Sequence, residues 1–301
     1  MKISVNINGA PVDEKERFSY LKECGFEACD IKLDEYFGVN GTFGDIDSVT
    51  DAQIKAHFTE LKKCAKDAKI EIGQTRSQFT GKLSDYEGGL KEVIKREIAC
   101  IKATKYLGAK YCVISPVVMD GRRYDLLVSE NFNAAAKFYK ELIPTLEECK
   151  VTGCIENMWT TDPVSRYTCA TVLSRAKELN KMVKKLGDNY KICLDIGHCA
   201  LTADNPVDVI GAVKDNLVCM HIHDNNGWAD LHAIPYSGFG KPVGLRPVRI
   251  DWPTTLAAIK ESGYKGNVNF DIVPPGPVDI RKDGYLYLAD IGRYFVSVIK
   301  E

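Results

Sequence analysis

Imidazole and carboxylate side chains gather in one part of this sequence. Four of the five histidines, His198, His221, His223 and His232, lie within 35 residues of the chain, and only His57 lies far from them. These are the side chains that most often bind divalent metals or move protons in enzymes. The sequence therefore points to chemistry in this region.

Ligand-type residues also occur in consecutive apolar segments. GCIENM contains Glu156, ICLDIGH contains Asp195, VCMHIHD contains His221, and NVNFDIV contains Asp271. A carboxylate inside an apolar strand is costly unless a cation or a metal balances it. Three carboxylates and one imidazole suit Mn²⁺, Mg²⁺, Co²⁺ or Zn²⁺. We therefore predict one divalent metal ion at these four residues, in preference to a metal-free network of charges.

Two histidines compete for the same ligand position. His221 and His223 are two residues apart in a predicted strand, so both side chains face the same side of the sheet. Only one of them needs to reach the metal. The other is then a neighbour of the ligands or a contact for the substrate, and Asp224 could orient both rings.

Further polar residues follow the predicted strands. His198 comes three residues after the sixth strand, and Asp230 and His232 lie in the segment after the seventh. We interpret these three residues and His223 as substrate-binding groups above the metal, with ordinary loop residues as the alternative. Trp159 could form an apolar wall for a substrate or belong to the core.

The elements that position these residues form a repeating pattern. Eight short apolar segments alternate with helical patterns, at 2–6, 28–33, 69–74, 111–115, 153–157, 191–195, 217–223 and 267–273. Each interval is long enough for a crossover helix between parallel strands. We predict a single-domain (β/α)8 TIM barrel over residues 1–301, with its active site at the carboxyl ends of the strands. A doubly wound sheet with an accessory domain is the alternative.

Composition limits the partners. The 301 residues carry 40 Lys+Arg against 41 Asp+Glu, a net charge of -1 with no basic excess for nucleic acid. No apolar run approaches the ~18 residues of a membrane span, and we expect no signal peptide. Many of the eleven cysteines lie in apolar segments, as expected of a cytoplasmic protein. A homo-oligomer is possible, and the sequence does not determine the oligomeric state.

Several motifs carry a resemblance to a known superfamily. They are IEN at Glu156, LDIGH at Asp195 and HIHDNNGWADLH from His221, followed by GFG, RIDW and GYKGNVNFD. The chain resembles the xylose isomerase-like TIM barrels, specifically the sugar phosphate isomerase/epimerase group, which is related to the AP endonuclease barrels. The resemblance implies one divalent metal on Glu156, Asp195, His221 and Asp271. It selects His221 because the ligand lies three residues before the acidic residue, here Asp224.

The chain also departs from the family pattern. The last ligand position is usually Glu, whereas this chain has Asp271, whose side chain is shorter by one methylene. Ketohexose epimerases carry an arginine about six residues after the metal histidine, where this chain has Gly227. The nuclease branch uses three metals and needs histidines after strands three and four. None occurs between His57 and His198, so a nuclease is not expected.

The resemblance leads to three hypotheses about function. The first is a metal-dependent isomerase or epimerase of a small sugar, in which Glu156 and Asp271 transfer protons on either side of an enediolate. The second is a metal-dependent dehydratase of a keto-inositol or related polyol. The third is a barrel that binds a polyol without turnover.

Whether the substrate is phosphorylated stays open from the sequence. Basic residues occur in predicted loops, at Arg76, Arg122, Arg123, Lys241, Arg246 and Arg249. These residues could form a phosphate site or could be isolated surface cations, and the sequence favours neither interpretation. No Gly-rich phosphate-binding loop accompanies them.

Overall fold

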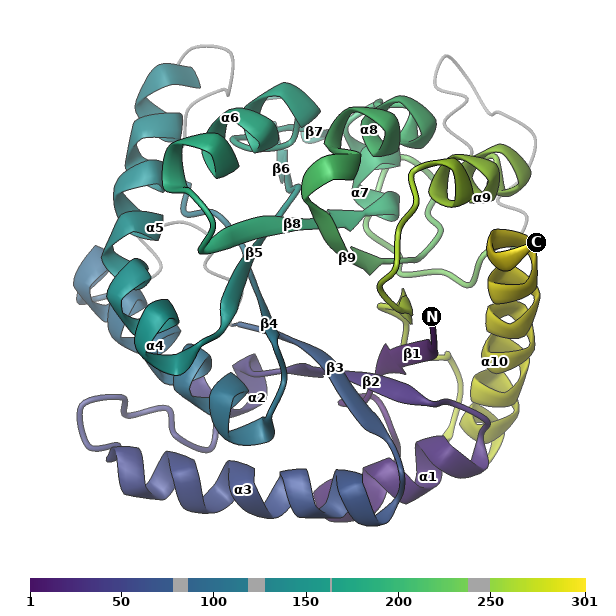
Figure 1. Cartoon of the computed structure of the whole chain (residues 1–301), viewed down its shortest axis with the longest axis horizontal. Helices are drawn as coiled ribbons and strands as arrows, with labels where there is room; N and C mark the ends of the chain where they lie inside the picture. The colour runs from purple at the N-terminus through teal and green to yellow at the C-terminus, as the bar shows by residue number, and fades with distance from the viewer. Residues whose placement is uncertain (78–85, 119–127, 163, 238–249) are drawn as a thin grey trace.

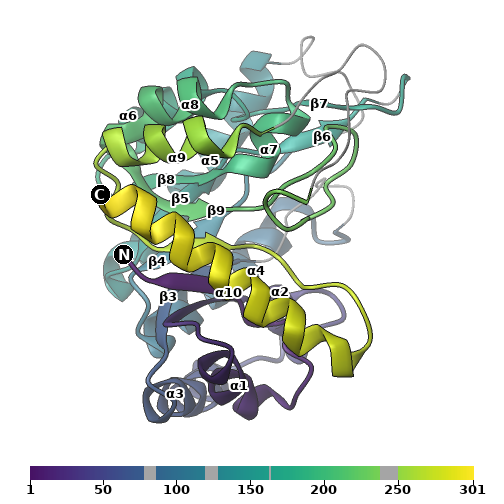
Figure 2. The same ribbon diagram turned by 90° about the vertical axis from the view of Figure 1, so that its right-hand side faces the viewer.

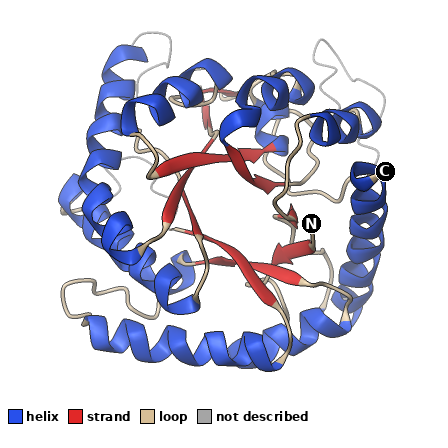
Figure 3. Cartoon of the chain, viewed as in Figure 1, coloured by secondary structure: helices blue, strands red, loops and turns tan. Residues whose placement is uncertain are grey.

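The strands of the protein form an inner ring, and the helices surround it (Figure 1). This computed structural model describes residues 1–77, 86–118, 128–162, 164–237 and 250–301. Figure 3 shows the two layers by colour, with the strands inside and the helices outside. An apolar core fills the space between the layers.

Eight parallel strands make the inner ring. They are β1 (Ile3–Asn6), β2 (Ala28–Lys32), β3 (Glu71–Arg76), β4 (Tyr111–Ile114), β5 (Thr152–Glu156), β8 (Tyr190–Asp195), β9 (Leu217–His221) and β10 (Val268–Phe270). The order is β10-β1-β2-β3-β4-β5-β8-β9. A parallel bridge between Ile222 and Phe270 brings β9 to β10, so the barrel is nearly closed. The predicted (β/α)8 TIM barrel is confirmed.

Helices connect successive strands on the outside of the barrel. They are α1 (Arg17–Glu23), α2 (Asp34–Phe37), α3 (Asp51–Asp67), α4 (Gly89–Leu107), α5 (Val128–Cys149), α6 (Ala176–Leu186), α7 (Ile196–Leu201), α8 (Pro206–Val213), α9 (Trp252–Glu261) and α10 (Val278–Lys300). Two of these helices begin with side-chain caps. Thr50 and Gln53 form a capping box on α3, and Asn205 caps α8 ahead of Pro206. None of the described helices is long and apolar enough to cross a membrane.

Several features at the carboxyl end of the barrel differ from the sequence prediction. The seventh strand was predicted to end at residue 223 and the eighth at residue 273, but β9 ends at His221 and β10 at Phe270, so His223 and Asp271 follow their strands. The third strand continues two residues beyond the predicted end and finishes at Arg76. A short hairpin, β6 (Trp159–Thr161) and β7 (Thr168–Ala170), follows β5 and was not predicted. Figure 2 places this hairpin at the end of the barrel opposite the two chain termini.

Other sequence interpretations fall outside the described residues. The segment 231–249, rich in Gly and Pro and without the pattern of a strand or helix, is described only as far as residue 237, and the similarly irregular segment 81–89 only from residue 86. Five of the basic residues considered for phosphate binding also lie outside, namely Arg122, Arg123, Lys241, Arg246 and Arg249.

Candidate metal centre

Three of the predicted ligands end three neighbouring strands. Glu156 is the last residue of β5, Asp195 of β8 and His221 of β9, and all three side chains are fully buried. The register pairs Asp195 directly with His221. Since the strands are parallel, their carboxyl ends meet at one end of the barrel. The fold therefore brings these three residues together, as the sequence predicted.

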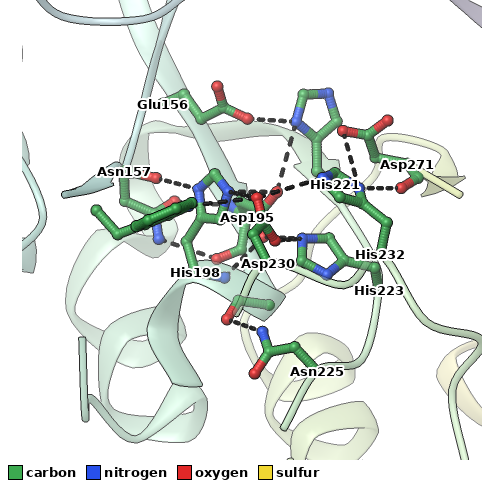
Figure 4. A network of polar contacts seen from close by, with 12 residues as sticks. Glu156, Asn157, Asp195, His198, His221, His223, Asn225, Asp230, His232 and Asp271 are labelled. Carbon is green, nitrogen blue, oxygen red and sulfur yellow. Dashed lines mark hydrogen bonds and ion pairs between the residues drawn. The ribbon is translucent and has the colours of Figure 1, made fainter. Parts of the chain in front are cut away.

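The three side chains converge on one point (Figure 4). Oε1 of Glu156 lies 2.5 Å from Nδ1 of His221, and Oδ2 of Asp195 lies 3.9 Å from the same nitrogen. One ligand atom from each residue lies within 4.8 Å of the other two. Oδ2 of Asp195 is buried and has no hydrogen-bond partner among the described residues. A buried acceptor without a donor, beside two other ligand atoms, fits a divalent cation.

The charges in the site also fit a cation. Burial alone would raise the pKa of Glu156, but Arg76 and His221 outweigh burial and lower that pKa to about 2. Burial opposes the charge on His221, but Cys193 and Glu156 outweigh it and raise the pKa of the ring well above its usual value. The His221 ring therefore carries positive charge among these carboxylates. A divalent ion would displace the ring proton and supply positive charge in its place.

A further carboxylate orients His221. Oδ2 of Asp30, in the middle of β2, lies 3.0 Å from Nε2 of His221, and Gln74 and Asn269 also donate to this oxygen. An imidazole that gives one N–H to a carboxylate presents its other nitrogen to a metal in a fixed direction. Asp30 was not among the predicted site residues, although a carboxylate in the apolar segment ACDIK carries the same signal as Asp195.

Asp271 lies at the same end of the barrel but faces two cations. Its Oδ1 lies 2.8 Å from Nζ of Lys32, and its Oδ2 accepts from Nη1 of Arg76 at 2.7 Å. Nη2 of Arg76 lies 3.6 Å from Oε2 of Glu156. Arg76 was predicted in a loop, and that prediction was wrong. It ends β3 and is buried between two of the predicted ligands.

The predicted substrate-binding residues form a second cluster around Asp230. Nε2 of His198 lies 3.3 Å from Asp230 Oδ2, Nε2 of His232 lies 3.2 Å from it, and Nε2 of His223 lies 3.5 Å from Oδ1. Nδ1 of His198 and Nδ1 of His232 each face a backbone carbonyl, at 2.7 and 2.5 Å. Each of these contacts turns Nε2 toward the centre of the cluster. These groups could therefore hold a substrate hydroxyl or a cation.

The backbone makes room for this cluster. A Cβ at Gly197 would come within 1.9 Å of Cε1 of His223, so the ring occupies space that only glycine leaves open. His223 stacks on His232, with ring centroids 4.3 Å apart. The side chain of Asp224 accepts from Nε1 of Trp252 at 3.1 Å rather than from a histidine ring.

Trp159 belongs to the edge of this cluster. It begins β6, its side chain is half-buried, and its Nε1 donates to Asp230 Oδ2 at 3.2 Å. Trp159 is therefore not a core residue and lies where it can contact a substrate. His57 lies apart on α3, 3.3 Å from Glu14.

Comparison with known proteins identifies the family. A family model described as xylose isomerase-like TIM barrel matches residues 18–289. The chain belongs to this family. The resemblance stated from the motifs is thereby confirmed at the level of the superfamily.

Solved structures share the fold over nearly the whole chain. A D-tagatose 3-epimerase-like protein is 20% identical, with a TM-score of 0.73 over 100% of this chain and 98% of that one. The 3-keto-D-glucoside 4-epimerase YcjR of E. coli is 17% identical, with a TM-score of 0.65 over 96% of this chain and 98% of that one. At these identities the likeness shows the fold alone.

A curated relative matches only part of the chain. The uncharacterized protein y4fM of Sinorhizobium fredii is 30% identical over 105 residues, which are 33% of this chain and 30% of that protein. The match therefore spans less than a third of either protein and carries no function.

The contact between Asp30 and His221 leads to a test. We expect Asp30→Asn to lower the affinity for Mn²⁺ roughly 10- to 100-fold, because the imidazole loses the carboxylate that orients it. Competition with a fluorescent chelator measures this affinity. His57→Ala, far from the site, is the control and should bind as the wild type does. Equal affinities for Asp30→Asn and wild type would contradict this role for Asp30.

The charge on His198 leads to a test on the metal-free protein. Burial lowers the pKa of His198, but Asp195 and Asp230 outweigh burial and raise it to about 9. In the unfolded chain it is about 6.5. This contribution to stability is therefore complete below about pH 6.5 and disappears as the pH rises toward 9. In chelator-treated protein, we expect the free energy of unfolding to fall across this range. The fall should be smaller in His198→Gln, and equal slopes would contradict the assignment.

Proposed function

We propose that this protein is a divalent-metal-dependent isomerase or epimerase of a small carbohydrate. The observation that carries the proposal is the convergence of Glu156, Asp195 and His221 at the carboxyl end of the barrel, where one carboxylate oxygen has no hydrogen-bond donor among the described residues. The neighbours in fold include proteins described as sugar epimerases, which is consistent with this class of reaction.

A divalent ion at these residues would supply a Lewis acid for a carbonyl oxygen and the hydroxyl oxygen beside it. Glu156 and Asp271 are the proposed proton-transfer groups. They end or follow strands on different sides of the ring, so they approach a substrate from different directions. One carboxylate removes the proton α to the carbonyl, and the other returns a proton to an adjacent carbon or to the opposite face.

The cluster around Asp230 would bind the hydroxyl groups of the substrate. His198 and His223 lie between Asp230 and Asp195, and His232 lies on the side of Asp271. The indole of Trp159 adds an apolar surface beside these polar groups. A ring of polar groups with one aromatic edge suits a polyhydroxylated substrate.

The position of Arg76 determines whether it could bind a phosphate group on the substrate. Its guanidinium is buried and directed at Asp271 and Glu156, so it is not available to a phosphate group. This pairing removes the one described candidate among the basic residues considered from the sequence. We therefore propose a neutral sugar, such as a ketohexose or a keto-glycoside, as the first substrate to test.

The test is exchange of the α-proton in D₂O, followed by NMR, with Mn²⁺-loaded protein and a panel of ketohexoses and 3-keto-glucosides. We expect exchange and a new epimer or isomer with at least one compound. Asp271→Asn should slow the exchange roughly 10²- to 10⁴-fold, the usual contribution of a general acid or base. His57→Ala should exchange at the wild-type rate.

The alternatives give different outcomes in the same experiment. A dehydratase would release water, and its product would be lighter than the substrate by one water in the mass spectrum. Binding without exchange on every compound, by protein that contains the metal, would contradict the enzyme proposal and favour a polyol-binding barrel.

A further inference from the structure

Each oxygen of the Asp271 carboxylate already has a cationic partner. Its Oδ1 faces Nζ of Lys32 at 2.8 Å and accepts from Nδ2 of Asn6 at 3.2 Å, while its Oδ2 accepts from Nη1 of Arg76 at 2.7 Å. Asp195 differs, because its Oδ2 is buried with no donor among the described residues. The two predicted ligands are therefore in opposite states. Asp195 has an oxygen without a hydrogen-bond donor in the described part of the chain, whereas Asp271 has a donor on each oxygen.

Arg76 ties Asp271 to its position. The guanidinium is always charged, is buried at the end of β3, and has Asp271 as its closest carboxylate. If Asp271 turned away, a buried cation would lose its best partner, which is strongly unfavourable. Lys32, at the end of β2, holds the other oxygen and is one-quarter exposed. Residues at the ends of β2 and β3 thus hold the carboxylate that follows β10.

The groups that can reach a common ligand position do not include Asp271. Within the described part of the chain, Glu156, Asp195 and His221 bring three ligand atoms within 4.8 Å of one another, and no such group contains Asp271. Its side chain is also shorter than the Glu that the family resemblance implies at this position. The position of Asp271, the length of its side chain and its pairing with two cations all indicate that it does not reach the metal.

We propose that Lys32 and Arg76 hold Asp271 off the metal, so that only Glu156, Asp195 and His221 bind the ion. This inference rests on the metal site of the proposed function and departs from the four-ligand set implied by the resemblance. Two carboxylates and one neutral imidazole balance the charge of a divalent ion. Three protein ligands also leave positions open for two substrate oxygens, as catalytic metal sites require. Asp271 then acts on the substrate alone.

The experiment compares the Co²⁺ absorption spectrum and the Mn²⁺ affinity of four proteins: wild type, Asp271→Asn, Asp195→Asn and His57→Ala. The spectrum of Co²⁺ reports its ligands, so loss of a neighbouring charge alone leaves the band positions in place. We expect Asp271→Asn to keep the wild-type bands and to lose no more than about tenfold in Mn²⁺ affinity, the low end of an outer-shell effect. Asp195→Asn should lose more than about 100-fold in Mn²⁺ affinity. His57→Ala should bind Mn²⁺ as tightly as the wild type does.

A measurement on the wild type keeps the inference testable if Asp271→Asn does not fold. Mn²⁺ prefers six ligands, so three protein ligands leave about three bound waters and four leave about two. Relaxation of the water protons counts them. About three waters support the inference.

The outcomes separate this inference from the function on which it rests. Shifted Co²⁺ bands together with a loss of affinity in Asp271→Asn as large as that in Asp195→Asn would overturn the inference. A count of about two waters would overturn it as well. In both cases the metal site would stand. Failure of the wild-type protein to bind either ion would overturn the metal site itself.

Discussion

Negative charge at one end of the barrel is the constraint on which the site depends. Five carboxylates gather there, from Asp30, Glu156, Asp195, Asp230 and Asp271. Ionised carboxylates out of water are costly unless cations and hydrogen-bond donors surround them. Lys32 and Arg76 supply two fixed positive charges, which leaves an excess of negative charge. The raised pKa values of His198, His221 and His232 show the same excess, because nearby negative charge favours the protonated form of each ring.

The fold makes this concentration of charge possible. Parallel strands end together, so residues far apart in the chain meet at one mouth of the barrel. Hydrogen bonds from the backbone then fix several of the groups. Asp195 caps α7 by accepting from the amide of His198, and the ring of His198 donates to the carbonyl of Asn157. Such groups are positioned before any ligand arrives, which lowers the cost of binding one.

The sequence predicted the barrel and brought out the three buried candidate ligands because both depend on local patterns. Apolar segments of strand length recur between helices, and Glu156, Asp195 and His221 each sit at the end of one. The pairing of Asp271 with Arg76 could not be read in the same way. It joins β10 to β3 across most of the chain, and the end of β3 lies two residues beyond the apolar segment that marks it. Strand ends are the least certain part of such a pattern.

Asp30 and the β6–β7 hairpin were missed for different reasons. Asp30 carried the buried-carboxylate signal, but it lies far from the other motifs and stood alone in the sequence. The hairpin has strands of only three residues, too short for alternation to show. Its importance lies in Trp159, which it places against Asp230.

The central claim is that a divalent cation binds Glu156, Asp195 and His221 and balances the charge of the two carboxylates. Anomalous X-ray scattering from a crystal grown with Mn²⁺ tests it most directly. The account predicts one strong peak within bonding distance of Oε1 of Glu156, Oδ2 of Asp195 and Nδ1 of His221. A crystal with no peak at these atoms, or with its peak only between Asp230 and the rings of His198 and His232, would contradict it.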